Sequence, residues 1–323
     1  MDEQDLPNDA RNRPLDTARI DEHAYLTGAP PIEEFLGYVR SRAEEGTADL
    51  GRLSEAWRAA AQCRRELELT EAGFADNAEI RPLPSELKPL AERELQEPGV
   101  RRSLERVPYY WAVVDLDQLV VHQRSLDLSF VRRLSARFPT RPTDEQLFQL
   151  AAGYPRPDPA KISVTRSENV TTFVSASSDL RILETTLLDP KSISGYSAPG
   201  RASRLVAVAV GYGCNFASAF HIRGRLVLQN ALHRESMVYR MGIRRVPCLV
   251  REISTEEDLV LVGANDVKQH LSLYVRSPRP PRLSDFLDPR LHVTLRVPFA
   301  NRLAHVQVNT QLSRARVAVM EGV

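Results

Sequence analysis

The chain of 323 residues is 42% hydrophobic and 26% charged, a composition typical of a soluble globular protein with about two domains. Its 43 basic and 42 acidic residues leave a formal net charge of +1, which excludes a general electrostatic attraction to DNA or to an anionic membrane. No apolar run reaches the ~18 residues that cross a bilayer, and residues 1–5 are too acidic for a signal peptide, so we expect a cytoplasmic protein without membrane association.

The N-terminal third is predicted to contain a tail and a helical domain. Residues 1–24 carry many charges and no aromatic side chain, so they lack the apolar surface that would offset the entropy of ordering, and we predict a disordered tail. Residues 25–100 repeat apolar side chains at helical spacing, including Phe35, Leu53 and Trp57. This pattern predicts a small helical domain, with Trp57 in its core.

A second domain is predicted over residues 105–255. It opens with an aromatic and β-branched strand at residues 109–114, followed by a helix that Asp127 or Ser129 caps. The four prolines between residues 141 and 160, around a short helical run, are interpreted as an insertion.

Further along this domain, residues 179–187 are predicted to be helical. The continuously apolar run at residues 205–210 predicts a strand that is buried on both faces. Arg223 and Gly224 are typical of a tight hairpin turn between two strands.

The C-terminal residues 256–323 are predicted to be a β-rich extension, with Val293, Leu295 and Val297 on one face of a strand. The proline-rich residues 278–282 favour an extended loop that a partner could reach. The whole chain is therefore predicted to have an α+β fold, in which a helical domain precedes a mixed-sheet domain.

The cysteines Cys63, Cys214 and Cys248 are too few and too widely spaced for a disulfide framework or a structural zinc site. Cys63 and Cys248 are expected to be buried as small apolar residues. Cys214, which follows Gly213, is a candidate exposed thiol.

The turn after residues 226–228 is the strongest candidate site. A predicted strand runs directly into Asn230, Ala231 and Leu232, and a helix follows whose first turn contains His233 and Arg234. The free N–H groups and the dipole of a helix N-terminus bind anions, and a guanidinium can hold a phosphate group with two hydrogen bonds. Cations in a first turn are unfavourable for the dipole unless an anion is bound, so we predict phosphate binding by Asn230, His233 and Arg234.

The order of these elements resembles the ParB/sulfiredoxin-like fold. In that fold a strand and a small turn precede a helix that opens with two basic residues and ends at a glycine, here Gly242, before a strand that begins Val-Pro, here Val246-Pro247. Upstream, residues 114–120 followed by Gln123 and Arg124 resemble the opening of a ParB-like domain. The resemblance implies that Gln123 and Arg124 approach the same phosphates as Arg234.

The sequence departs from this family at three places. Ala231-Leu232 replaces the usual glycine, and Leu232 also stands where sulfiredoxin has its catalytic cysteine. Val121-His122 replaces the Asn-Pro pair of partition proteins, and no helix-turn-helix segment is predicted. The resemblance therefore implies a nucleotide-binding fold without sulfiredoxin or partition chemistry.

Carboxylates near the turn supply candidate catalytic and metal-binding groups. Asp115 and Asp117 could hold Mg²⁺ through water, although carboxylates at a strand end more commonly cap or remain solvated. Glu235 or Asp115 could act as a general base, although the helix dipole alone explains a first-turn glutamate.

Two functions follow from these residues. The first is a nucleotide-binding protein that takes a nucleoside triphosphate with Mg²⁺, with hydrolysis or phosphotransfer as the candidate activity. The alternative is a non-catalytic scaffold component of a bacterial assembly, which binds protein or DNA. Protein is the favoured partner because the net charge is balanced. The identity of the nucleotide and the existence of turnover stay open.

Overall fold

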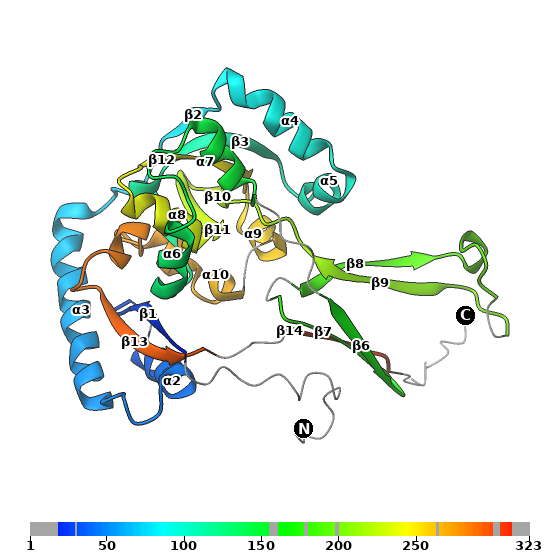
Figure 1. Ribbon diagram of the computed structural model, residues 1–323, viewed down its shortest axis with the longest axis horizontal. Helices are drawn as coiled ribbons and strands as arrows, with labels where there is room; N and C mark the ends of the chain where they lie inside the picture. The colour runs from blue at the N-terminus through cyan, green and yellow to red at the C-terminus, as the bar shows by residue number, and fades with distance from the viewer. Residues whose placement is uncertain are drawn as a thin grey trace, which may run out of the picture. The chain divides into compact units, whose positions relative to one another are not determined.

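The chain folds into two compact units (Figure 1). Unit 1 comprises residues 1–156 and 214–300, and unit 2 comprises residues 157–213 and 301–323. The computed structural model describes residues 19–29, 31–154, 161–177, 180–197, 200–262, 265–299 and 304–311. The two points at which the chain leaves and rejoins unit 1 are neighbours, because Ala217 N donates to Ala151 O at 2.7 Å.

A six-stranded mixed sheet forms the centre of unit 1, in the order β2-β3-β12-β10-β11-β4. The pairs β10–β12 and β11–β4 are parallel, and the other pairs are antiparallel. The strands are β2 (Ile80–Pro82), β3 (Tyr109–Asp115), β4 (Val120–Val121), β10 (Ser218–Ile222), β11 (Arg225–Asn230) and β12 (Arg245–Glu252). This mixed sheet with its helices confirms the predicted α+β class.

Helices cover both faces of the six-stranded sheet because its strands are apolar on both sides. Along β12, Cys248 packs in a cluster with α6 and α8, whereas the next residue, Leu249, packs with α4, α5 and α7 on the other face. A third cluster includes side chains of α9, α10 and a π-helical turn. The helices are α4 (Lys88–Gln96), α5 (Pro98–Leu104), α6 (Leu128–Ser135), α7 (Asp144–Ala151), α8 (Leu232–Arg240), α9 (Glu256–Val262), α10 (Asn265–Gln269) and the π-helical Ser272–Arg276.

The helix predicted inside the proline-rich insertion is α7, and it belongs to the core. Thr143 caps it in a reciprocal arrangement with Gln146. Phe148 is fully buried and its ring centroid lies 4.8 Å from that of Trp111. The local prediction of a helix was therefore correct, and its interpretation as part of an insertion was wrong for residues 144–151, which contribute to the core.

A second sheet in unit 1 joins distant parts of the chain in the order β13-β1-β5. Helices α2 (Ile32–Arg42) and α3 (Leu50–Glu71) pack on it, with Phe35 and Trp57 near Leu295. The strands are β1 (Ile20–Leu26), β5 (Ser125–Asp127) and β13 (His292–Pro298). The predicted disordered tail is wrong from Ile20 onward, because β1 pairs with β13 along its whole length; residues 1–18 lie outside the described part.

The division into units differs from the predicted domains. Residues 25–100 share cores with residues 105–255, since Leu26 clusters with Ala112, and Leu87 clusters with Trp111. The apolar faces of these helices are buried against the sheets as well as against each other. In the predicted β-rich extension, α9 and α10 are helices, β13 belongs to unit 1, and β14 (Ala304–Asn309) belongs to unit 2.

The proline-rich loop predicted to be accessible to a partner is instead buried. Arg279, Pro280, Pro281 and Arg282 are all buried. Arg279 donates to Asp285 at 2.8 and 3.1 Å, and both arginines pair with Glu71 of α3. Asp285 also pairs with Arg64 at 3.2 Å. These ion pairs hold the extended loop against α3.

Unit 2 consists of two antiparallel sheets, β14-β7-β6 and β8-β9. Its strands, besides β14, are β6 (Ile162–Ser167), β7 (Val170–Ser175), β8 (Leu180–Leu188) and β9 (Leu205–Tyr212). Residues 179–187 were predicted to be helical, and this was wrong: β-branched residues and cross-strand pairing with β9 favour a strand. The prediction that residues 205–210 are buried on both faces was also wrong, because no residue of β9 is fully buried and Val206 is 66% exposed.

Candidate functional site

The predicted turn lies between β11 and α8, where Ala231 precedes the helix. Ala231 has a φ of 82°, in the left-handed region that glycine adopts most easily. The turn thus has the backbone conformation that the family's glycine would favour, but an alanine forms it. No side chain caps the start of α8.

Asn230 and Arg234 connect the turn to the neighbouring protein backbone. Asn230 Nδ2 donates to Phe216 O at 3.0 Å and to Asn215 Oδ1 at 3.1 Å. The Arg234 guanidinium donates to Leu150 O at 2.6 Å and to Asn215 O at 2.6 Å. These bonds occupy the paired N–H groups that were predicted to hold a phosphate, so Arg234 links α8 to the end of α7.

His233 accepts a hydrogen bond, which defines its protonation. Asp127 N donates to His233 Nε2 at 3.2 Å, so Nε2 is unprotonated. Burial lowers the pKa of His233, and the nearby Asp127 carboxylate only partly opposes this shift. His233 is therefore neutral at pH 7 and contributes no positive charge to the turn.

The structure brings Asp127, rather than Arg124, to the turn. Arg124 pairs with Glu34 of α2, and its Nη2 lies 3.5 Å from Tyr274 Oη. Gln123 is exposed. The chain segment that was predicted to approach His233 does so, but its basic side chain is directed to α2 and the π-helical turn.

The predicted metal ligands lie at the other end of α8. Asp115 Oδ1 accepts from Asp117 N at 2.8 Å, and Asp117 Oδ1 accepts from Tyr239 Oη at 2.5 Å. Tyr239 is more than one helical turn beyond Arg234. Within the described residues, no group of three or more His, Cys, Asp or Glu side chains is arranged to hold a metal ion. Mg²⁺ binding by Asp115 and Asp117 stays a prediction, and both carboxylates already accept hydrogen bonds within the protein.

Glu235 is a buried carboxyl group in the first turns of α8. It is 3% exposed, and its Oε2 has no hydrogen-bond partner among the described residues. Burial raises its pKa to about 7, although Arg234 opposes this shift. Burial likewise raises the pKa of the Cys248 thiol, and Glu235 adds to that shift. A general base must reach its substrate, whereas Glu235 faces the core next to Cys248.

The cysteines are distributed as predicted. Cys63 and Cys248 are buried, and Cys214 is partly exposed, with its Sγ 3.4 Å from Ser103 Oγ.

A polar cluster between β1, α2 and β5 was not predicted from the sequence. His23 Nδ1 lies 3.2 Å from Ser125 Oγ and 3.3 Å from Tyr38 Oη. His23 Nε2 lies 3.8 Å from Asp127 Oδ2, which is longer than a hydrogen bond. Only the pairing of β1 with β5 brings these residues together, so no local pattern could reveal them. The spacing describes a polar network rather than an activated serine.

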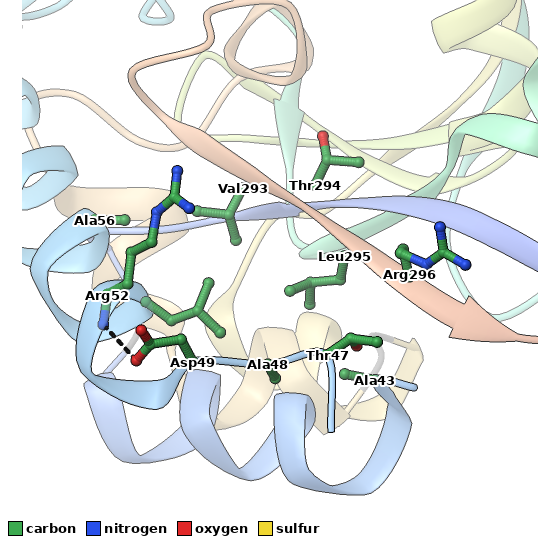
Figure 2. A pocket seen from close by; sticks show the side chains of 11 residues that line it. Ala43, Thr47, Ala48, Asp49, Arg52, Ala56, Val293, Thr294, Leu295 and Arg296 are labelled. Atoms are coloured by element: carbon green, nitrogen blue, oxygen red, sulfur yellow. Dashed lines mark hydrogen bonds between the residues drawn. The ribbon is translucent and has the colours of Figure 1, made fainter. Parts of the chain in front are cut away.

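A cavity of about 420 Å³ opens beside β13 (Figure 2). Leu295 points towards it, and Thr294 points to the opposite side of the strand. Arg52 and Arg296 lie at its margin, and Arg296 pairs with Glu44 at 2.8 Å. The lining contains none of the predicted site residues; it is formed by Ala43, Thr47, Ala48, Asp49, Arg52, Leu53, Ala56, Val293, Thr294, Leu295 and Arg296.

The β8–β9 hairpin of unit 2 exposes an apolar surface. Cross-strand pairing places six side chains on one side, which we name the hairpin face: Ile182, Thr185, Leu187, Val206, Val208 and Val210. Leu187 is 68% exposed, Val206 is 66% exposed and Ile182 is 46% exposed. The hairpin face contains no charged residue, whereas Arg181 and Glu184 belong to the opposite face.

Comparison with protein-family models, with curated proteins and with solved structures gave no significant match. Within the described part of the chain, every helix is too short or too polar to pass through a bilayer. The choice between the two predicted functions therefore depends on the contacts described above.

Proposed function

We propose that this chain is a non-catalytic component of a protein assembly and that it self-associates through the hairpin face. The main evidence is the exposure of Leu187 and Val206. They form a cross-strand pair, and about two-thirds of each residue is exposed to solvent. Contiguous exposed apolar patches are uncommon in monomeric proteins and mark interaction surfaces. Unit 2 also buries few side chains of its own: among its described residues these are Val174, Ser175 and Leu180.

A second copy of this chain is the occupant that the charges favour. An uncharged face can meet its own copy across a two-fold axis without placing like charges together. The net charge of +1 adds no long-range repulsion between copies. The outer edges of β8 and β9 have no partner strand among the described residues, so strand pairing can add main-chain hydrogen bonds to the apolar contact.

Sedimentation velocity over about a hundredfold range of protein concentration tests this proposal, because an association equilibrium shifts with concentration. The wild type should show a concentration-dependent dimer. Val206→Asp, on the hairpin face, should remain monomeric. Ala209→Asp, on the opposite face of the same strand, is the matched control and should dimerise as the wild type does. A wild type that is monomeric throughout the range contradicts the proposal.

Nucleotide binding at the turn stays a prediction, and the contacts of the turn do not favour it. Arg234 is bonded to two backbone carbonyl groups, and Arg124 is paired with Glu34. A panel of ATP, CTP, GTP and ADP with Mg²⁺ tests it by thermal shift. Stabilisation that is lost in Arg234→Ala would restore nucleotide binding as the leading function.

A further inference from the structure

Arg251 on β12 is a buried cation without a counter-charge. It is 6% exposed. Its Nη1 donates to Gln229 Oε1 at 3.3 Å, and its buried Nε has no hydrogen-bond partner among the described residues. An unpaired buried charge is strongly unfavourable, and buried charges in proteins are normally paired.

The other buried arginines of the described chain show the usual arrangement. Arg64 and Arg279 share Asp285 at 3.2 and 2.8 Å. Arg225 pairs with Asp76 at 2.6 Å, and Arg282 pairs with Glu71. Arg251 alone in this set lacks a carboxylate partner among the described residues. The carboxylate partners are what offset the cost of burying the other arginines.

A second arginine, Arg106, precedes by three residues Tyr109, the β3 residue that lies opposite Arg251 on β12. Burial lowers the pKa of Arg251, and the positive charge of Arg106 lowers it further. Arg106 follows α5 and is exposed, and no described carboxylate pairs with it. Neither arginine therefore has a carboxylate partner among the described residues.

The side chains around Arg251 offer few hydrogen-bond acceptors. Gln229 Oε1 accepts from both Arg251 and Ser218 Oγ, and the amide nitrogen of Gln229 donates to no described residue. Phe220 lies opposite Arg251 on β10, with its ring centroid 5.6 Å from the guanidinium carbon. These residues come from the ends of three neighbouring strands, so the arrangement is fixed by the sheet.

We propose that Arg251 and Arg106, with Gln229, form a binding site for a phosphate group, which supplies the missing counter-charge. Two arginines match the charge of about −1.5 to −2 that a phosphate monoester carries at pH 7, and a carboxylate would leave one of them uncompensated. Arg234 is not one of the proposed ligands, because its guanidinium already donates to Leu150 O and Asn215 O.

Thermal stability measured in phosphate and in chloride at equal ionic strength tests the site. Inorganic phosphate should raise the Tm of the wild type, and acetate should not. Arg251→Met should abolish the phosphate effect without lowering the Tm in chloride, because it removes an unpaired buried charge of similar volume. Arg166→Met, which removes an exposed arginine of unit 2, should keep the full phosphate effect.

Isothermal titration separates the sources of the phosphate group and covers the case in which Arg251→Met does not fold. Tighter binding of methyl phosphate than of inorganic phosphate supports an organic phosphate ester, and the reverse order supports free phosphate. Exposed Arg106→Ser should weaken binding by about tenfold, the loss of one charge-assisted hydrogen bond. Equal effects of phosphate and chloride on the wild type, or unchanged affinity in Arg106→Ser, would overturn the proposal.

Discussion

Strands β12 and β9 have similar apolar sequences and opposite environments. On β12, residues 246–251 are all buried, because helices cover both faces of its sheet. On β9, Val206 is 66% exposed, because the hairpin has no covering helix and no further strand among the described residues. An apolar strand in a sequence therefore predicts burial. The rest of the fold determines whether the same chain or another molecule buries the strand.

The same charge placed on both strands should have very different effects. Val250→Asp should destabilise unit 1 by more than about 4 kcal/mol, since it buries an unpaired carboxylate in a fully enclosed site. Val208→Asp on the hairpin face should change the free energy of unfolding of the monomer, measured at a protein concentration below that of dimer formation, by less than about 1 kcal/mol. Urea titration of both variants measures the difference, and equal destabilisation would show that the hairpin face is covered within the monomer.

A second prediction concerns the buried ions. Asp285→Ala should cost about 3–5 kcal/mol, because it leaves Arg64 and Arg279 buried without their shared carboxylate. Arg251→Met should cost much less in the absence of phosphate, since Arg251 has no described carboxylate to lose. Denaturant titration in a chloride buffer compares the two variants. A larger loss in Arg251→Met would mean that Arg251 is compensated inside the protein.

The buried carboxyl group of Glu235 should make stability depend on pH. Its pKa is raised from 4.5 to about 7 in the folded protein, so unfolded chains release this proton first as the pH rises. Ionisation of Glu235 therefore has no effect on the free energy of unfolding below about pH 4.5. It lowers the free energy of unfolding by the full amount above about pH 7. Glu235→Gln should therefore stabilise the protein by about 3 kcal/mol at pH 8 and by almost nothing at pH 4.5. An equal effect at both pH values would contradict the assigned burial of this group.

The last prediction concerns the turn. Arg234→Ala removes hydrogen bonds to Leu150 O and Asn215 O and should cost about 1–3 kcal/mol, as for bonds that a charged donor makes. Phosphate stabilisation should persist in this variant, because we assign it to Arg251. Thermal melting with and without phosphate measures both effects, and loss of the phosphate effect would return the site to the turn.

Local patterns predicted much of the fold. The hairpin at Arg223-Gly224, the Asp127 cap of α6 and the strand before α8 depend on residues close in sequence, and each is present in the structure. The strand β8 was mistaken for a helix because a short apolar run fits both periods, and only its partner β9 decides between them.

The position of the candidate turn was also predictable, but its chemistry was not. The partners of Arg234 come from Leu150 and Asn215, which are distant in sequence. The pairing of β1 with β13 and the isolation of Arg251 likewise depend on the assembled fold. A sequence shows which hydrogen-bond donors are present. Only the folded structure shows which of them are already bonded within the protein and which are left to bind a ligand.

The adjacency of the two points where the chain leaves and rejoins unit 1 has a consequence for design. Besides the bond from Ala217 to Ala151, Gly153 approaches the backbone of Asn215 so closely that an added Cβ would lie 2.8 Å from its carbonyl oxygen. The residues between these points form a cassette whose ends are already held together. Replacing the cassette with a short glycine-containing linker, or with a different hairpin, alters a loop of unit 1 and also removes β7, the strand with which β14 pairs.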